Sequence, residues 1–417
     1  MAEQTPADRD EHYVVISADG HAGADIPHYR PYLESKWLDD FDAWAAEYIN
    51  PFEDLQGDDG SRSWDSDRRL ADLEADGQVA EVLYPNTIPP FYPIGSLVAQ
   101  PPPVTALDAE RRWAGLQAHN RWLADFCDQA PGRRGGIFQI TLHDLDASIT
   151  EMRWAKDRGL FGGIVLPGAP PGGDVPQLHD PYYEPLWQAC ADLEIVVNHH
   201  GGSATPVMGP TGVDRVLFML ESPFYSHRAF SALVLSGVLE RHPNLHLVFT
   251  EQGTAWVGDE LLKLDYMVER LATSHGSRES AWGREVAETL SLKPSEYWAR
   301  QCHVGSSFIR AHEVADRASA GIDRIMWGSD YPHQEGTGPY TVEALRWVFS
   351  SVPEGEVRSM LGGNAAKLYG FDLDLLQPLA QLHGPSVAQI AEPLPPGVVD
   401  REAERSPAFI GYNFDAA

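Results

Sequence analysis

The chain has 417 residues, of which 43% are hydrophobic and 10% aromatic, so it can bury a large core as one barrel with insertions or as two domains. Asp and Glu outnumber Lys and Arg by 61 to 31, and the formal charge of −30 argues against nucleic acid and anionic membranes as partners. The sequence has neither an apolar stretch of about 18 residues nor a basic and then apolar leader, so we expect a soluble cytoplasmic protein.

Short β-branched runs alternate with amphipathic segments of helical length, which favours a parallel sheet wrapped by helices. Residues 1–12 are polar and are expected to be disordered. The expected strands, of which the seventh is the weakest, are residues 13–18, 79–84, 136–142, 163–166, 195–199, 245–250, 301–304 and 324–328. The expected helices are residues 106–128, 145–158, 182–193, 226–241, 256–273, 311–319 and 342–352. This α/β order predicts a (β/α)8 TIM barrel over residues 13–371.

Three stretches interrupt or follow the alternation. Residues 22–78 contain acidic runs and three tryptophans, which indicates an insertion after the first strand that forms a cap over the barrel mouth. Residues 85–104 are rich in proline and should form a rigid, extended loop on the same rim. Residues 372–417 have many prolines and no clear period, so we expect a C-terminal extension that packs on the barrel or on a neighbouring subunit of a homo-oligomer such as a dimer.

Polar residues gather at the ends of four expected strands, where a barrel of this kind places its reactive groups. The first strand ends in Asp19-Gly20-His21, whose two polar side chains can point the same way from an extended chain. The other three ends carry His199 and His200, Glu251, and Asp330 with His333 and Glu335 after it. Imidazole and carboxylate groups are the usual protein ligands of zinc, iron and manganese, so these ends predict a metal site.

Each position also has a purely structural interpretation. One histidine of the His199-His200 pair can belong to the core. Glu251 can cap the helix that follows it, and Asp330 can form an Asx turn before Pro332. The joint pattern favours the metal site, because all four groups fall at strand ends of one barrel.

The stretches ISADGH, RRGGIFQITL, GGIVLP, VVNHHGG, HPNLHLVFTEQG and IMWGSDYPH resemble the amidohydrolase superfamily, in the branch called amidohydrolase family 2. The resemblance covers residues 13–370. Relatives in this branch include aminocarboxymuconate semialdehyde decarboxylase, aromatic acid decarboxylases and several hydrolases. The resemblance implies a distorted (β/α)8 barrel with a metal held by an HxH or ExH pair on strand one, a His on strand five and an Asp on strand eight.

By position, the resemblance implies Asp19, His21, His200 and Asp330 as metal ligands, with His199 as the alternative to His200. The chain departs from the family pattern in two places. Asp19 stands where the family has His or Glu, which exchanges one carboxylate for another. Glu251 stands on strand six, where decarboxylases of the family carry a histidine that handles protons, and this change disfavours decarboxylation.

The expected reaction is therefore hydrolysis of an amide, ester or thioester bond by metal-activated water. The expected cofactor is one or two ions of iron, zinc or manganese, with Glu251 as an additional ligand. Asp330 and Glu251 would be catalytic, and His333 would orient the nucleophile. Aromatic residues on the rim loops indicate a small, apolar or aromatic organic substrate. The alternative is metal-dependent nonoxidative decarboxylation of an unsaturated or aromatic carboxylic acid.

Overall fold

The computed structural model describes residues 11–50, 56–86, 89–93, 102–205, 208–273 and 278–415. Residues 1–10 of the segment expected to be disordered and half of the proline-rich loop 85–104 lie outside these ranges, whereas His12 is described and forms an antiparallel bridge with Ser386. Eight parallel strands follow one another around a single sheet in the order of the chain. They are β1 (Ile16–Ala22), β2 (Ala80–Pro85), β3 (Arg134–Gln139), β4 (Gly163–Val165), β5 (Val197–His200), β6 (Leu247–Thr250), β7 (Cys302–Ser307) and β8 (Ile325–Gly328).

Backbone hydrogen bonds join β1 to the residues that directly follow β8. The Asp330 N–H donates to the Asp19 carbonyl at 2.8 Å, and the His21 N–H donates to the Tyr331 carbonyl at 2.7 Å. A parallel bridge joins Gly20 to Tyr331. The sheet is thereby nearly closed, and the predicted (β/α)8 barrel is confirmed.

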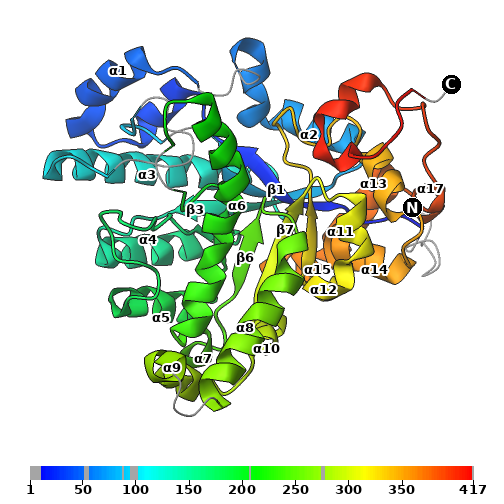
Figure 1. The fold of residues 1–417 in the computed structure, drawn as a ribbon. Helices are drawn as coiled ribbons and strands as arrows, with labels where there is room; N and C mark the ends of the chain where they lie inside the picture. Colours follow the sequence, from blue (N-terminus) through cyan, green and yellow to red (C-terminus); the bar gives the residue numbers. More distant parts are fainter. Residues whose placement is uncertain are drawn as a thin grey trace.

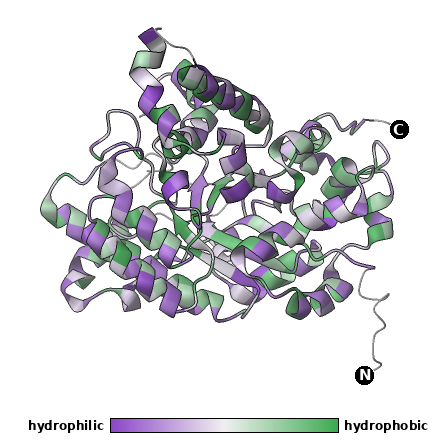
Figure 2. Cartoon of the chain, turned by 90° about the horizontal axis from the view of Figure 1, so that it is seen from below, coloured by the Kyte–Doolittle hydropathy of each residue, from purple (hydrophilic) through white to green (hydrophobic). Residues whose placement is uncertain are grey.

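Helices surround the barrel on its outer side (Figure 1). Those between the strands are α3 (Ala106–Cys127), α4 (Leu145–Asp157), α5 (Glu184–Asp192), α6 (Gly212–Leu235), α7 (Val238–Arg241), α8 (Ala255–Thr273), α9 (Arg278–Thr289), α10 (Pro294–Gln301), α11 (Ala311–Ala315) and α12 (Arg317–Ala320). After β8 come α13 (Thr341–Phe349), α14 (Glu354–Arg358), α15 (Asn364–Tyr369), α16 (Leu373–His383) and α17 (Val387–Ala391). Hydrophobic and hydrophilic residues are mixed along the helices that surround the strands (Figure 2). In the described part of the chain, no helix has the length and apolarity that a membrane crossing requires.

The insertion after β1 contains α1 (Leu38–Glu47), α2 (Ser66–Ala75) and the 3-10 segments Ile26–Tyr32, Ser35–Trp37 and Gly57–Ser63. Its aromatic residues pack around Phe91 of the loop after β2, with Trp37, Phe41 and Trp44 rings 6.2–6.4 Å from it between centroids. The Trp44 indole N–H also donates to the Tyr92 carbonyl at 2.9 Å. The insertion and the described part of this loop therefore form one unit.

The C-terminal extension is more regular than expected. It contains α16 and α17, and its last segment forms a small apolar cluster of Leu394, Val399, Phe409 and Tyr412 against α13. The Trp347 ring of α13 contacts Tyr412, with 5.4 Å between centroids. The extension thus packs on the barrel of its own chain.

Three other local predictions differ from the structure. The helix expected at 226–241 begins fourteen residues earlier, at Gly212, and a separate short helix follows at Val238. The seventh strand runs to Ser307 instead of ending at 304. Residues 278–289 and 294–301 are helical, although no helix was expected there.

Candidate metal centre

The predicted site residues come from the carboxyl ends of four strands. Asp19 and His21 lie on β1, His200 ends β5, Glu251 directly follows β6, and Asp330 follows β8 after one residue. Parallel strands of a barrel all end at the same face, so these side chains meet at one place although they are far apart in sequence.

The backbone around these residues is unusually tight. Glu251 and Asp330 have φ angles of 58° and 60°, in the left-handed region that non-glycine residues rarely adopt. A Cβ on Gly328 would lie 2.7 Å from the Asp19 Cβ, so only glycine lets β8 approach β1 this closely. Closure of the barrel between β8 and β1 therefore fixes the backbone at Asp19 and Asp330.

Close contacts link the possible metal-ligand atoms of Asp19, His21, His200 and Asp330. His21 Nε2 is 3.3 Å from Asp19 Oδ1 and 3.1 Å from Asp330 Oδ1. His200 Nε2 is 3.6 Å from the same Asp19 oxygen. His200 Nδ1 lies 3.1 Å from the Gly201 carbonyl, so a proton on Nδ1 would leave the Nε2 lone pair directed at this cluster.

This arrangement fits a metal ion. Asp19 Oδ1, His21 Nε2, His200 Nε2 and both Asp330 oxygens are buried without a hydrogen-bond partner in the described structure. Such orphaned groups are costly unless something else binds them. Asp19, His21 and His200 place one donor atom each within 4.8 Å of one another, and His21, Asp330 and His333 form a second, overlapping group. One cation at the centre would satisfy these atoms.

The surroundings of the two aspartates shift their pKa values in opposite directions. Burial would raise the pKa of Asp19, but the imidazoles of His200 and His21 outweigh burial and lower this pKa. Burial, together with the charges of Asp19 and Glu251, raises the pKa of Asp330 well above its usual range. For His21, burial is outweighed by the two aspartates, which raise its pKa.

The two histidines at the end of β5 lie in different environments. His200 faces the cluster, whereas His199 is buried on the other side, with its ring 6.3 Å from that of Phe249. Burial lowers the pKa of His199 to about 3, so it is neutral near pH 7. Of the two, His200 is therefore placed to bind a metal.

Glu251 lies at the edge of the cluster, with Oε2 3.4 Å from His200 Nδ1. Helix capping is carried by another residue, because the Thr254 N–H just before α8 donates to Glu313 Oε1 at 2.6 Å. Burial, partly offset by His200, raises the pKa of Glu251. In the described structure its carboxylate is therefore turned toward the site.

His333 lies beside the cluster, with its ring 4.6 Å from that of His21 in an edge-to-face arrangement. Burial and the positive charge on His21 lower its pKa well below the usual range. A neutral imidazole at this place can accept a proton or bind a metal.

Sequence reasoning missed three residues that hold the ligands in place. Ser307, at the end of β7, donates to Asp19 Oδ2. Arg69 of α2 donates to the His21 carbonyl at 2.7 Å, and its guanidinium lies 4.8 Å from the centre of the Tyr331 ring. Tyr84 of β2 packs on the His200 ring, with 4.7 Å between centroids. The Ser306-Ser307 pair was a usable signal, because it is polar and ends a strand.

Comparisons with known proteins identify a family and several similar decarboxylases. The amidohydrolase family model matches residues 40–371. The chain is 24% identical to gamma-resorcylate decarboxylase of Rhodococcus jostii over 288 residues, which is 64% of this chain and 78% of that relative. Among solved structures it is similar to 5-carboxyvanillate decarboxylase from Sphingomonas paucimobilis, with a TM-score of 0.60, 20% identity, and coverage of 86% and 100% of the two chains. A dihydroxybenzoic acid decarboxylase from Polaromonas sp. JS666, with bound manganese and 2-nitroresorcinol, has a TM-score of 0.57, 16% identity, and coverage of 86% and 97%.

Proposed function

Since this chain belongs to the amidohydrolase family, we propose that it is a metal-dependent nonoxidative decarboxylase of an aromatic carboxylic acid. The observation that carries this proposal is the similarity to gamma-resorcylate decarboxylase over 64% of the chain. The orphaned donor atoms at the strand ends support it, because they provide the ligand set that such an enzyme needs. The proposal replaces hydrolysis, which the sequence alone favoured, as the first candidate.

In this proposal Asp19, His21, His200 and Asp330 hold one divalent ion of manganese, zinc or iron. The ion would supply a positive charge that binds the acidic oxygens of the substrate and stabilises negative charge that develops on it. Manganese is present in three of the similar solved structures, which supports a site of this donor chemistry.

The chain's own residues must supply a proton. Loss of CO2 breaks the bond between the ring and the carboxylate carbon, and the electron pair left on the ring carbon takes up one proton. Asp330 is placed to deliver it, because its carboxyl is buried at the strand ends and lies 3.1 Å from His21 Nε2. His333, on the same loop and next to His21, is placed to return a proton to Asp330.

Hydrolysis of an amide, ester or thioester is the second candidate, and Glu251 favours it. The Glu251 carboxylate lies 3.4 Å from His200 Nδ1 and would add a further negatively charged ligand for a cation beside this histidine. Glu251→Gln keeps the side-chain volume and removes the charge. It should reduce turnover strongly if Glu251 binds metal in a hydrolase, and only modestly if Asp330 carries the proton in a decarboxylase.

The deciding experiment measures CO2 release by protein loaded with manganese, zinc or iron. The substrates would be 2,6-dihydroxybenzoate, 5-carboxyvanillate and related hydroxybenzoates, with aryl esters and thioesters as a parallel panel. We expect CO2 from at least one aromatic acid, and loss of this activity in Asp330→Asn. Turnover of the ester panel without CO2 from any acid would overturn the proposal and establish the hydrolase.

A further inference from the structure

Two amide side chains near the metal centre are buried with one atom unpaired. The side-chain nitrogen of Gln139 and the side-chain oxygen of Asn86 make no hydrogen bond within the part of the chain that the structure describes. Gln139 is 8% exposed and Asn86 7%. A buried polar atom without a partner is costly, so each of these atoms is expected to bind a ligand or a water molecule.

Gln139 points into the barrel. It is the last residue of β3, and Ile137, two residues before it, packs in the barrel interior with Val248. Side chains two residues apart on a strand point the same way, so Gln139 points inward as well. His200 and Ser307 are likewise the last residues of β5 and β7.

Gln139 completes a layer of the interior that otherwise serves the metal centre. In a (β/α)8 barrel the four side chains of one layer come from alternate strands. Here β1 contributes His21, β5 contributes His200, and β7 contributes Ser307, which donates to Asp19. The fourth side chain of this layer comes from β3 and is Gln139, so its free amide nitrogen lies beside the proposed metal ligands.

Asn86 lies beside Gln139 on the neighbouring strand. β2 and β3 pair in parallel, with Leu83 opposite Gly136. The same register, three residues further along both strands, places Asn86 opposite Gln139 on backbones about 5 Å apart. The Asn86 N–H donates to the Ala22 carbonyl at 2.9 Å, so the extended strand reaches this position.

The free oxygen of Asn86 faces the same space. Tyr84, two residues before Asn86, packs on the His200 ring, so Asn86 also points inward. The Asn86 side-chain nitrogen donates to Ser63 Oγ of the insertion at 2.9 Å, which leaves the side-chain oxygen for a ligand. A hydrogen-bond donor on Gln139 and an acceptor on Asn86 therefore lie side by side in the barrel mouth.

A donor beside an acceptor is the complement of a hydroxyl group. A hydroxyl can donate to the Asn86 oxygen and accept from the Gln139 nitrogen, whereas a carboxylate or a methoxy oxygen can only accept. We propose that Asn86 and Gln139 bind a ring hydroxyl of the substrate and make the enzyme specific for hydroxylated aromatic acids. The proposal rests on the proposed function, in which the acidic oxygens of the substrate bind the ion and its ring lies in the barrel mouth.

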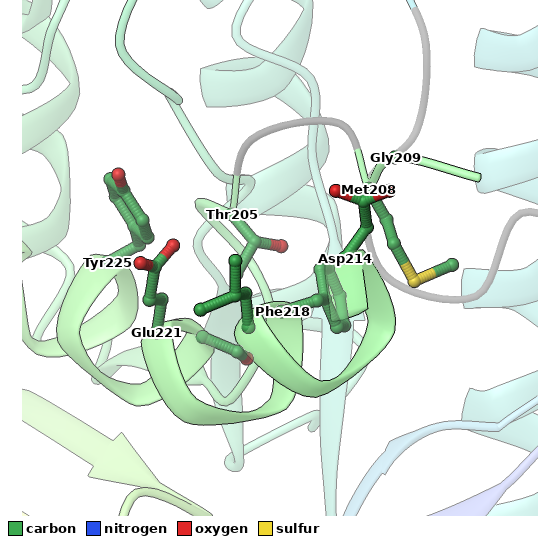
Figure 3. A pocket seen from close by; sticks show the side chains of 9 residues that line it. Thr205, Met208, Gly209, Asp214, Phe218, Glu221 and Tyr225 are labelled. Atoms are coloured by element: carbon green, nitrogen blue, oxygen red, sulfur yellow. The ribbon is translucent and has the colours of Figure 1, made fainter. Parts of the chain in front are cut away.

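The cavity lined by α6 is less suited to an anionic ring. It has a volume of about 150 Å³ and lies between Thr205, in the loop after β5, and the first half of α6 (Figure 3). Its lining includes the carboxylates of Asp214 and Glu221. These carboxylates would repel an aromatic acid, whereas the amides of Asn86 and Gln139 carry no charge.

The test measures the binding of nitrophenols to the manganese-loaded protein by calorimetry. A nitro group replaces the carboxylate in these probes, so no CO2 can be lost. The reference is 2-nitrophenol, and the probes are 2-nitroresorcinol, 4-nitroresorcinol, 3-nitrocatechol, nitrohydroquinone and the analogues in which the second hydroxyl is methylated. We expect at least one dihydroxy probe to bind about 10–100-fold more tightly than both 2-nitrophenol and its own methoxy analogue. Gln139→Met and Asn86→Leu should each abolish this preference and leave the affinity for 2-nitrophenol largely unchanged.

Two further variants are controls. Ser63→Ala breaks the hydrogen bond to Asn86 but keeps the Asn86 oxygen, so the preference should remain. Gln188→Met makes the same chemical change on the exposed side of α5, where Gln188 bonds to Asp192, and should also keep it. Metal content and circular dichroism report whether each variant has folded. Gln139→Leu or Asn86→Ala takes the place of a variant that has not.

Two results would overturn the proposal. One is a wild type that binds no dihydroxy probe more tightly than 2-nitrophenol. The other is a preference that survives in Gln139→Met or in Asn86→Leu, which would indicate that water satisfies the unpaired amide atom. Failure of the proposed function gives a different result, because no acid would then release CO2 while the hydroxyl preference and its loss in the variants would persist.

Discussion

Glu81→Gln should destabilise both the fold and the metal centre. Glu81 of β2 and Arg69 of α2 are fully buried, and the Arg69 Nη2 lies 2.6 Å from Glu81 Oε2. A second buried guanidinium, that of Arg134, lies 3.5 Å from Glu81 Oε1. The substitution removes the carboxylate that faces both guanidinium groups, so two buried cations lose this negatively charged neighbour.

The expected loss of stability follows from the burial of these charges. Loss of one partner of a buried ion pair costs about 3–5 kcal/mol, which is a large part of the ~5–15 kcal/mol that stabilises a typical domain. The centre is affected as well, because Arg69 donates to the His21 carbonyl and stacks on Tyr331. We therefore expect weaker metal binding by Glu81→Gln, although no ligand is changed.

Glu74→Gln is the matched control. Glu74 lies on α2, the helix that carries Arg69, and it pairs with Arg133 at 2.6 Å. The side chains of Glu74 and Arg133 are 26% and 13% exposed. Loss of a pair near the surface costs about 0–1 kcal/mol. Urea unfolding with and without metal, and titration of the apoprotein with Mn²⁺, measure both effects. If Glu81→Gln unfolds within about 1 kcal/mol of the control and binds Mn²⁺ equally well, the pair does not support the centre.

Asp330→Ala should purify with little metal, measured by elemental analysis, because it removes a direct ligand; full occupancy would refute the assignment. Ser307→Ala removes the hydrogen bond to Asp19 Oδ2 and should weaken metal affinity by about 10–100-fold in the same titration, whereas unchanged affinity would show that Ser307 has no orienting role. Stability should fall as the pH drops from about 6.5 to about 3, because burial lowers the pKa of His119 and His303 to about 3 while the unfolded chain takes up protons near pH 6.5. Each histidine contributes a slope of about 1.4 kcal/mol per pH unit to the free energy of unfolding. In His119→Gln the urea midpoint should therefore depend less steeply on pH than in the wild type, which would confirm the share of His119.

The strands and their polar ends could be predicted from the sequence because both are local signals. A run of β-branched residues followed by Asp, His or Glu identifies Asp19, His200, Glu251 and Asp330 without knowledge of the fold. Alternation along the strand predicts that His199 and His200 point to opposite sides, but it does not say which of them faces the site. The structure is needed for that choice.

Other parts depend on contacts that no local pattern records. The first half of α6 is apolar on several sides and lacks the single stripe of a barrel helix, so its start was missed. Arg69 is a charged residue in a polar stretch of the insertion, and only the fold shows that it is buried beneath His21. Ser307 lies on a short strand of weak propensity, whose end could not be located from hydrophobicity.

The hydrogen bonds that join the first strand to the last have a consequence for the order of folding. Asp19 and His21 on β1 are synthesised long before Asp330 and Tyr331, which follow β8 and hydrogen-bond to them. The active centre can therefore form only when the final strand docks and the sheet loses its two free edges. A chain truncated before β8 would have open sheet edges and would lack Asp330, so metal binding of the proposed kind would report that the barrel has closed.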